Sequence, residues 1–263
     1  MEVALYQVDA FTGRLFGGNP AAVCPLEAWL PEATMQAIAA ENNLSETAFF
    51  VPEGEGFGLR WFTPAVEVDL CGHATLASAY VIFERLRREA GKVRFLTRSG
   101  ELVVARDGER LRMDFPARPP QVCEAHADLV PALGGRPWAV LGARDYLVVY
   151  ETAAEVAALR PDMERLKQVD RFAVIVTAPG EDCDFVSRFF APSKGVPEDP
   201  VTGSAHCTLV PYWSGRLGKR SLYARQISAR GGELWCEDAG ERVSMAGEAV
   251  LYLEGRIRVP EAE

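Results

Sequence analysis

The chain contains one sequence motif twice, and this repetition limits its fold more than any other feature. The first copy, Arg60–Pro64, reads Arg-Trp-Phe-Thr-Pro, and the second, Arg188–Pro192, reads Arg-Phe-Phe-Ala-Pro. Each copy leads through a polar loop with acidic residues to a glycine, Gly72 or Gly203, and then to an apolar run. The two copies start 128 residues apart in a chain of 263 residues. Such self-similarity indicates an internal duplication, so we predict two similar domains.

The apolar run after each glycine predicts a buried helix, over residues 72 to about 86 and 204 to about 213. A helix that is hydrophobic nearly all round its axis lies in a protein core rather than on its surface. The first turn of such a helix has backbone N–H groups without acceptors and a partial positive charge. We therefore expect an anion to bind at Gly72-His73 and at Gly203-Ser204. The alternative is that the preceding loops cap both helix starts.

Strand-like segments surround both predicted helices, and they indicate the fold class. Many short strands with one buried helix in each half predict an α+β fold, in which a curved sheet wraps around its helix. Residues 153–167 have the composition of a further helix. The proline-rich segment Pro116–Pro120 is the stiffest linker, so we predict domains of residues 1–116 and 117–263. The last strand, residues 249–259, either stays in the second domain or packs back on the first.

The composition argues against several classes of protein. A hydrophobic content of 48% and a charged content of 25% are typical of a globular chain. The net charge is −9 and no basic stripe is present, which argues against nucleic-acid binding. The first residues lack the features of an export signal, and no apolar run reaches the length of a membrane span. We therefore expect a cytoplasmic protein without membrane contact.

The cysteines and histidines do not predict a metal site. The six cysteines lie far apart, without a Cys-x-x-Cys pair, and the chain has only three histidines. In a reducing compartment this pattern indicates free thiols rather than disulfides or zinc ligands. We therefore predict no metal site.

Glu46 is the first candidate for a catalytic side chain. It lies between Leu44 and the apolar run Ala48–Val51, at a predicted junction between helix and strand. Desolvation at such a position favours the protonated form of a carboxyl group, so the group can both accept and donate a proton near neutral pH. The alternative is a glutamate at a strand edge that points into water.

His73, Asp199 and Ser204 are further polar candidates near the two helix starts. His73 directly follows Gly72, where the helix dipole disfavours the imidazolium form, so we expect a neutral ring. Ser204 has the same place in the second copy, and a pseudo-twofold axis would bring the two side chains opposite each other. Each of the three also has a simpler alternative role, in a helix cap, in the core or in a turn.

Several motifs in the same order resemble the PhzF-like family of phenazine-biosynthesis-related isomerases and, more distantly, diaminopimelate epimerase and proline racemase. The matching segments cover nearly the whole chain and are Val8–Thr12, Gly18–Pro20, Asn43–Phe49, Phe62–Pro64, Cys71–Ala74, Asp114–Ala117, Ala143–Tyr146 and Glu198–Ala205. The resemblance implies two similar domains, each a β-barrel-like sheet around a central helix, with the active site in the cleft between them. It also implies a homodimer and an enzyme that needs no cofactor.

The resemblance also implies roles for individual residues. Glu46 matches the carboxylate that moves a proton in this family, while His73, Asp199 and Ser204 match its other polar site residues. The implied substrate is a small anionic metabolite that carries a carboxylate. The residues that we assign to substrate binding are Asn19, Gly72, Thr202 and Gly203.

A racemase or epimerase that uses Cys71 is an alternative within the same fold. The resemblance to the racemases of this fold implies one cysteine before each helix glycine, with the two cysteines as opposed bases. Here Cys71 precedes the first glycine, but Thr202 precedes the second. A threonine hydroxyl does not replace a thiolate at neutral pH, so isomerisation through Glu46 alone is favoured.

Two other classes of function are weaker alternatives. Ser204, His73 and Asp199 are the residue types of a hydrolase triad. However, the sequence around Ser204 lacks the Gly-x-Ser-x-Gly turn that exposes a nucleophile. A non-catalytic protein that binds a small molecule is the other alternative, and only turnover would separate it from an enzyme.

Overall fold

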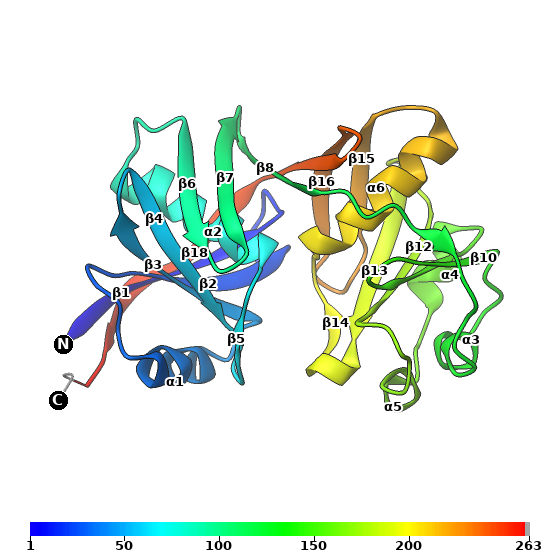
Figure 1. Ribbon diagram of the computed structural model, residues 1–263, viewed down its shortest axis with the longest axis horizontal. Helices are drawn as coiled ribbons and strands as arrows, with labels where there is room; N and C mark the ends of the chain where they lie inside the picture. The colour runs from blue at the N-terminus through cyan, green and yellow to red at the C-terminus, as the bar shows by residue number, and fades with distance from the viewer. Residues whose placement is uncertain (261–263) are drawn as a thin grey trace. The chain divides into compact units, whose positions relative to one another are not determined.

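The structure is a computed structural model that describes residues 1–260, and the chain divides into two units (Figure 1). One unit comprises Met1–Asp114 together with the end of the chain from Ala246, and the other comprises Phe115–Met245. The first boundary therefore lies close to the division that we predicted after residue 116.

The last strand, β18 (Ala249–Arg258), lies in the first unit and not in the predicted second domain of residues 117–263. It runs antiparallel to β1 (Glu2–Ala10), from Arg258 opposite Glu2 to Ala249 opposite Ala10. Because β2 pairs with the other side of β1, the return of β18 leaves neither edge of β1 unpaired.

The first unit is a mixed sheet with few helices. Its elements in chain order are β1, β2 (Asn19–Pro25), α1 (Glu32–Asn42), β3 (Glu46–Glu53), β4 (Gly56–Phe62), β5 (Glu67–Val68), α2 (Gly72–Val81), the π-helical turn η1 (Ile82–Leu86), β6 (Lys92–Thr97), β7 (Gly100–Asp107), β8 (Arg110–Pro116) and β18. The pairs β1–β2, β3–β4, β4–β5, β6–β7 and β7–β8 are antiparallel, whereas β2–β3 and β4–β6 are parallel.

The second unit repeats this pairing order. Its elements are β9 (Gln121–Val122), α3 (Leu129–Leu133), β10 (Ala139–Gly142), β11 (Tyr146–Val149), α4 (Ala153–Ala158), α5 (Met163–Leu166), β12 (Val174–Pro179), β13 (Phe185–Ala191), η2 (Pro192–Lys194), β14 (Val196–Asp199), α6 (Gly203–Leu217), β15 (Ser221–Gln226), β16 (Gly232–Asp238) and β17 (Arg242–Gly247). The pairs β10–β11, β12–β13, β13–β14 and β15–β16 are antiparallel, and β11–β12 and β13–β15 are parallel. The predicted α+β fold with two pseudo-symmetric domains is confirmed, because β10–β16 follow the scheme of β1–β7.

In each unit the predicted buried helix follows the fifth strand of the shared pairing order: α2 follows β5, and α6 follows β14. Nearly every residue of α2 is buried, and strands of the first unit surround it in Figure 1. Its hydroxyl side chains are satisfied within the helix, since Thr75 Oγ1 donates to the Cys71 carbonyl and Ser78 Oγ donates to the Ala74 carbonyl. In the second unit α6 extends beyond the predicted end near residue 213 and stops before Gly218, whose φ of 66° is left-handed.

The predicted helix over residues 153–167 is wrong, because this segment forms the two short helices α4 and α5. Pro161 lies between them and has no backbone N–H to continue a helix. Each piece also has its own N-cap: the Thr152 hydroxyl accepts from the Glu155 N–H, and the Asp162 carboxylate accepts from the Arg165 N–H.

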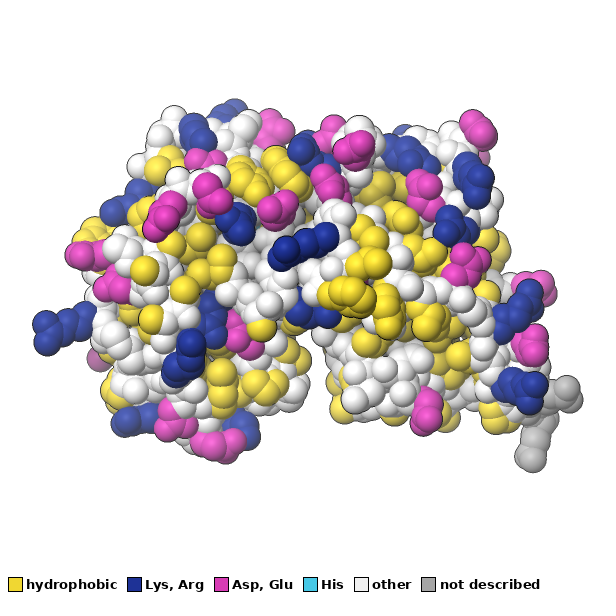
Figure 2. Space-filling view, turned by 180° about the vertical axis from the view of Figure 1, so that it is seen from behind, with side chains coloured by type: hydrophobic (Ala, Val, Ile, Leu, Met, Phe, Trp, Pro, Cys, Tyr) yellow, Lys and Arg dark blue, Asp and Glu magenta, His cyan; other side chains and the backbone are white. Residues whose placement is uncertain are grey.

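The surface of the molecule agrees with the composition. On the face drawn in Figure 2, acidic and basic side chains are interspersed rather than gathered by sign. None of the helices within residues 1–260 combines the length and the apolar character that a membrane span requires.

The core position of α2 gives a stability prediction. Leu76 is 0% exposed, so we expect Leu76→Ala to leave a cavity and to lower the free energy of unfolding by about 2–5 kcal/mol. Leu253→Ala is the control, because Leu253 is 41% exposed and its loss should change stability by less than about 0.5 kcal/mol. Urea unfolding followed by circular dichroism measures both variants, and equal effects would contradict the central position of this helix.

Candidate active site

The structure brings Glu46 and His73 into contact. Glu46 is the first residue of β3 and His73 is the second residue of α2. The Oε2 atom of Glu46 lies 3.1 Å from Nε2 of His73, and the two side chains are 17% and 5% exposed. Both atoms are buried, and neither has a hydrogen-bond partner elsewhere in residues 1–260. The pair is therefore a nearly dry carboxylate–imidazole contact with no competing partner.

The other ring nitrogen of His73 faces two further polar side chains. Its Nδ1 lies 3.2 Å from Nδ2 of Asn19 and 3.5 Å from Sγ of Cys71. Ser45 Oγ donates to Oδ1 of Asn19 at 3.3 Å, so the asparagine amide is itself held in place. We assigned Asn19 to the site from the sequence but missed Ser45. In the sequence, only the position of Ser45 next to Glu46 indicated that it belongs to the site.

The contacts of His73 bear on its predicted neutral state, which stays a prediction. Burial alone lowers the pKa of the ring, but the neighbouring Cys71 and Glu46 side chains raise that pKa well above its usual value. The carboxylate is the decisive neighbour near neutral pH, because the Cys71 thiol is then uncharged. A carboxylate at 3.1 Å outweighs the partial charge of the helix start, which is roughly half a unit charge.

Cys71 does not have the properties of a reactive thiolate. Burial and the nearby Glu46 carboxylate raise the pKa of its thiol to about 11. Nucleophilic and basic cysteines have a lowered pKa instead. Together with Glu46 and His73, however, Cys71 forms a group of three possible metal ligands whose donor atoms lie within 4.8 Å of one another.

Neither central helix is capped by the side chain that precedes it. Cys71 and Thr202 are the N-cap residues, and neither makes a side-chain capping bond. In the described part of the chain, no acceptor is found for the N–H groups of Gly72 and His73, nor for those of Gly203 and Ser204. The loops thus leave these amides free, as an anion site requires, and the anion itself stays a prediction.

A second cluster of polar groups lies before α6 in the second unit. The Thr202 hydroxyl donates to Oδ2 of Asp199 at 2.5 Å. Gln226 accepts from the Thr202 N–H at 2.8 Å and donates to the Asp199 carbonyl at 2.7 Å. Gln226 therefore holds the loop before the helix in place. Because Gln226 lies on β15, more than 20 residues after this loop, no local sequence pattern predicted its contact with the loop. Ser204 makes no side-chain hydrogen bond among residues 1–260, and its role stays a prediction.

The duplicated motif contains a duplicated ion pair. In the first unit Arg60 on β4 binds Glu67 on β5 through two hydrogen bonds of 2.7 Å. In the second unit Arg188 on β13 binds Glu198 on β14 through two hydrogen bonds of 2.7 and 2.9 Å. Each pair ties the loop before a central helix to the sheet, and each uses the planar fork geometry of a guanidinium group.

The strand registers show which site residues have no counterpart in the other copy. Phe62 pairs with Thr47 and the equivalent Phe190 pairs with Val174, so Ala173 has the place of Glu46. The parallel strands then place Ala143 where the first copy has Asn19. The acid and the amide that contact His73 therefore belong to the first copy alone.

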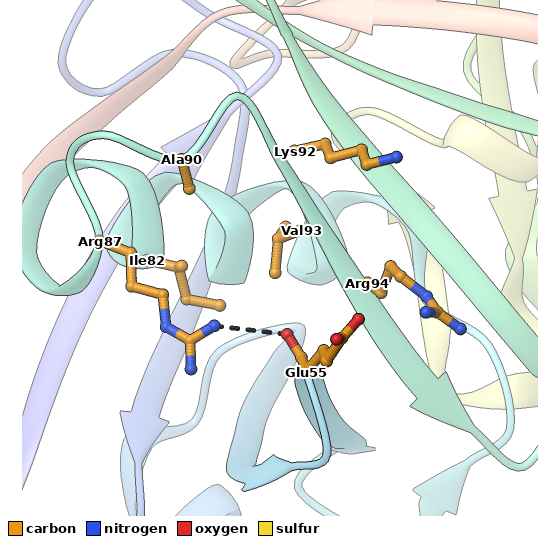
Figure 3. Close-up of a pocket in the computed structure, with 7 residues that line it drawn as sticks. All are labelled: Glu55, Ile82, Arg87, Ala90, Lys92, Val93 and Arg94. Carbon is orange, nitrogen blue, oxygen red and sulfur yellow. Dashed lines mark hydrogen bonds between the residues drawn. The ribbon is translucent and has the colours of Figure 1, made fainter.

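A small pocket of the first unit does not involve these residues (Figure 3). It has a volume of about 150 Å³ and is lined by Glu55, Ile82, Arg87, Ala90, Lys92, Val93 and Arg94. Arg87 donates to the Glu55 carbonyl at its rim. The pocket lies beside η1, at the end of α2 opposite His73, and is thus separate from the polar cluster.

Comparison with known proteins identifies the family. The model of a family described as phenazine biosynthesis-like protein matches residues 8–255. The chain belongs to this family. An uncharacterized isomerase of Pseudomonas aeruginosa is 56% identical over 260 residues, which are 98% of this chain and 100% of that protein. The crystal structure of a PhzF-family phenazine biosynthesis protein from Enterococcus faecalis has a TM-score of 0.96 at 47% identity, over 98% of this chain and 100% of that chain.

A more distant structure shares the fold alone. A probable proline racemase from Agrobacterium radiobacter is 13% identical with a TM-score of 0.63, over 98% of this chain and 93% of that chain. The family that we predicted from the sequence is confirmed, and so is its likeness to the racemase fold. The roles of the single site residues stay predictions.

The three histidines allow a direct test of the electrostatics. Burial lowers the pKa of His206 to about 4, while His73 is expected to titrate above its ordinary value of about 6.5. Because the folded-state pKa of His73 is raised, its contact with Glu46 stabilises the fold fully below about pH 6.5, and the contribution is lost as the pH rises through the raised pKa. Titration of the ring signals by NMR, assigned with His73→Gln and His206→Gln, measures both values. A His73 midpoint below that of a free histidine would contradict this account.

The duplicated ion pair allows a test of stability. Arg188 and Glu198 are 10% and 24% exposed, so Arg188→Met should leave a carboxylate without its partner and cost roughly 3 kcal/mol. Arg225→Met is the matched control, because Arg225 and Asp182 are 40% and 72% exposed and such pairs contribute less than about 1 kcal/mol. Denaturant unfolding of both variants measures the difference, and equal losses would refute a structural role for Arg188.

Proposed function

We propose that the protein is a cofactor-independent isomerase that moves a proton on a small carboxylate-bearing metabolite, with Glu46 as both base and acid. The observation that carries the proposal is the 3.1 Å contact between Glu46 and His73, whose facing atoms have no other partner in residues 1–260. The names of two relatives support the reaction class, since proteins of Pseudomonas aeruginosa and Halalkalibacterium halodurans that are 56% and 44% identical are described as uncharacterized isomerases.

The geometry gives the two oxygens of Glu46 different tasks. Oε2 faces the His73 ring at 3.1 Å and is buried. Oε1 is then available to the substrate. In the first step a carbon–hydrogen bond next to a carbonyl or conjugated group breaks, and the proton goes to Oε1. In the second step Oε1 returns this proton to another carbon of the conjugated system, and the carboxylate is restored.

The substrate class follows from the open helix starts. The N–H groups of Gly72 and His73 have no acceptor among residues 1–260, and they lie beside the Glu46 carboxyl that His73 contacts. A carboxylate on the substrate would accept from these amides and gain from the helix dipole. We propose that the equivalent amides of Gly203 and Ser204 also bind a carboxylate, with Asp199 and Thr202 as neighbouring polar groups.

The duplication disfavours the alternative of a racemase with two opposed bases. Such an enzyme needs one proton-transfer group on each side of the reacting carbon. The second copy offers Ala173 in place of Glu46 and Thr202 in place of Cys71. Because burial and the Glu46 carboxylate raise the pKa of the Cys71 thiol to about 11, Glu46 is the base that we propose among these residues.

The decisive variant is Glu46→Gln. Glutamine keeps the size of the side chain and can still accept a hydrogen bond from His73, but it cannot take up a proton. We expect folding to persist and turnover to fall by about two to four orders of magnitude. A screen of small carboxylates in D2O, followed by NMR for deuterium uptake, supplies the substrate and the assay. Turnover close to that of the wild type would remove Glu46 from this role.

Cys71→Ala is the matched variant at the other nitrogen of the His73 ring. Because we assign Cys71 to packing rather than to proton transfer, at least a tenth of the activity should remain, while stability falls by about 1 kcal/mol. Loss of turnover in a folded Cys71→Ala protein, together with an active Glu46→Gln protein, would instead favour racemisation through the thiol.

We also propose that the protein is a homodimer, as the family resemblance implies. Sedimentation velocity at micromolar concentration tests this assembly directly. A single species with the mass of two chains is the expected result, and a monomer would contradict it.

A further inference from the structure

The cluster around His73 contains three metal-binding side chains of different chemistry. The carboxylate of Glu46, the thiol of Cys71 and the imidazole of His73 each place a donor atom within 4.8 Å of the other two. Cys71 is 7% and His73 is 4% exposed, so the donors are largely withdrawn from water. We propose that this cluster binds a thiophilic divalent metal ion of the zinc and cadmium class, and that the ion inhibits the protein.

The donor set and its spacing support this proposal. Zinc takes oxygen, nitrogen and sulfur ligands at about 2.0–2.3 Å, so ligand atoms in its tetrahedral shell lie roughly 3.3–3.7 Å apart. The contacts from His73 to Glu46 and from His73 to Cys71 are already 3.1 and 3.5 Å. These contacts use opposite ring nitrogens, so a metal on one nitrogen requires the side chain at the other nitrogen to move. Rotation of the Cys71 and Glu46 side chains can supply such a movement.

The facing atoms of His73 and Glu46 give a further indication of the site. Nε2 of His73 and Oε2 of Glu46 are buried atoms without a hydrogen-bond partner in residues 1–260. A metal ion on Nε2 would leave the ring proton on Nδ1, which lies 3.2 Å from the amide of Asn19. The Asn19 oxygen would accept this proton and orient the ring, as the outer partners of metal-bound histidines do, once the amide turns and gives up the bond from Ser45 to Oδ1.

The bound ion acts as an inhibitor in this proposal. Binding forms bonds from the metal to sulfur, nitrogen and oxygen and releases the Cys71 thiol proton and the Nε2 proton of His73 to the solvent. It also occupies the carboxylate that we assign to proton transfer, so the predicted inhibition rests on the proposed function. The binding itself does not, and it can be measured without a substrate.

Cobalt(II) and zinc(II) are the probes for this test. We expect the full-length protein, kept reduced with a phosphine, to bind one cobalt ion and to show a thiolate-to-cobalt charge-transfer band in the near ultraviolet. Zinc added in equal amount should displace the cobalt and abolish the band. Calorimetry of zinc binding gives the affinity, with a dissociation constant in the micromolar range or below.

The variants identify the ligands. Cys71→Ala should remove the band and weaken zinc binding at least tenfold, and Glu46→Gln should weaken binding with the band retained at high cobalt. The matched control is Cys207→Ala, since Cys207 is also buried at 2% exposure but is not part of the donor group, and this variant should behave as the wild type. If Cys71→Ala does not fold, Cys71→Ser replaces it.

Three outcomes would overturn the proposal. The charge-transfer band could persist without Cys71, the affinity could be unchanged in both site variants, or zinc could bind only at millimolar concentration as an adventitious ion. A protein that binds zinc as predicted but isomerises its substrate at the same rate with zinc bound would refute the proposed role of Glu46 and leave the metal site intact.

Discussion

The loop before each central helix depends on one bidentate ion pair between an arginine and a glutamate. The arginine is the first residue of the duplicated motif, on β4 or β13, and its partner lies on the short next strand, β5 or β14. In the second unit Arg188 also donates to the carbonyls of Val156 and Leu159 at the end of α4. Removing these charges from water is costly, so both pairs need the full set of bonds that they make. In return, each ion pair holds the start of a buried helix in place, while the first N–H groups of that helix have no capping acceptor.

The two copies then diverge in chemistry while they keep the same backbone. The first copy places Asn19, Glu46 and Cys71 around His73, and the second has Ala143, Ala173 and Thr202 at the corresponding positions, with Ser204 in place of the histidine. Among these corresponding positions, the carboxyl group that can move a proton is found in one copy alone. This asymmetry, more than the identity of any single residue, is why we assign proton transfer to one carboxylate rather than to two opposed bases.

Much of this arrangement could be predicted from the sequence because it depends on local patterns. The repeated Arg-aromatic-Phe-x-Pro motif predicted the duplication, and the apolar runs after Gly72 and Gly203 predicted the buried helices. What failed depended on partners distant in the chain. His73 lies 27 residues from Glu46 in sequence, so the helix dipole alone did not reveal the carboxylate that lies beside its ring. Gln226 and the return of β18 to β1 were likewise determined by tertiary contacts, which one sequence does not reveal.

The most direct measurement of the central claim follows the fate of the transferred proton. A substrate labelled with deuterium at the hydrogen that leaves is converted in ordinary water, and the product of the first turnovers is analysed by mass spectrometry and NMR. A single buried carboxyl group returns part of the hydrogen that it has removed, so our account predicts that a measurable fraction of the label reappears at the new carbon position. A product that carries only solvent hydrogen from the first turnover, with inversion at the reacting carbon, would show two opposed bases and contradict the account.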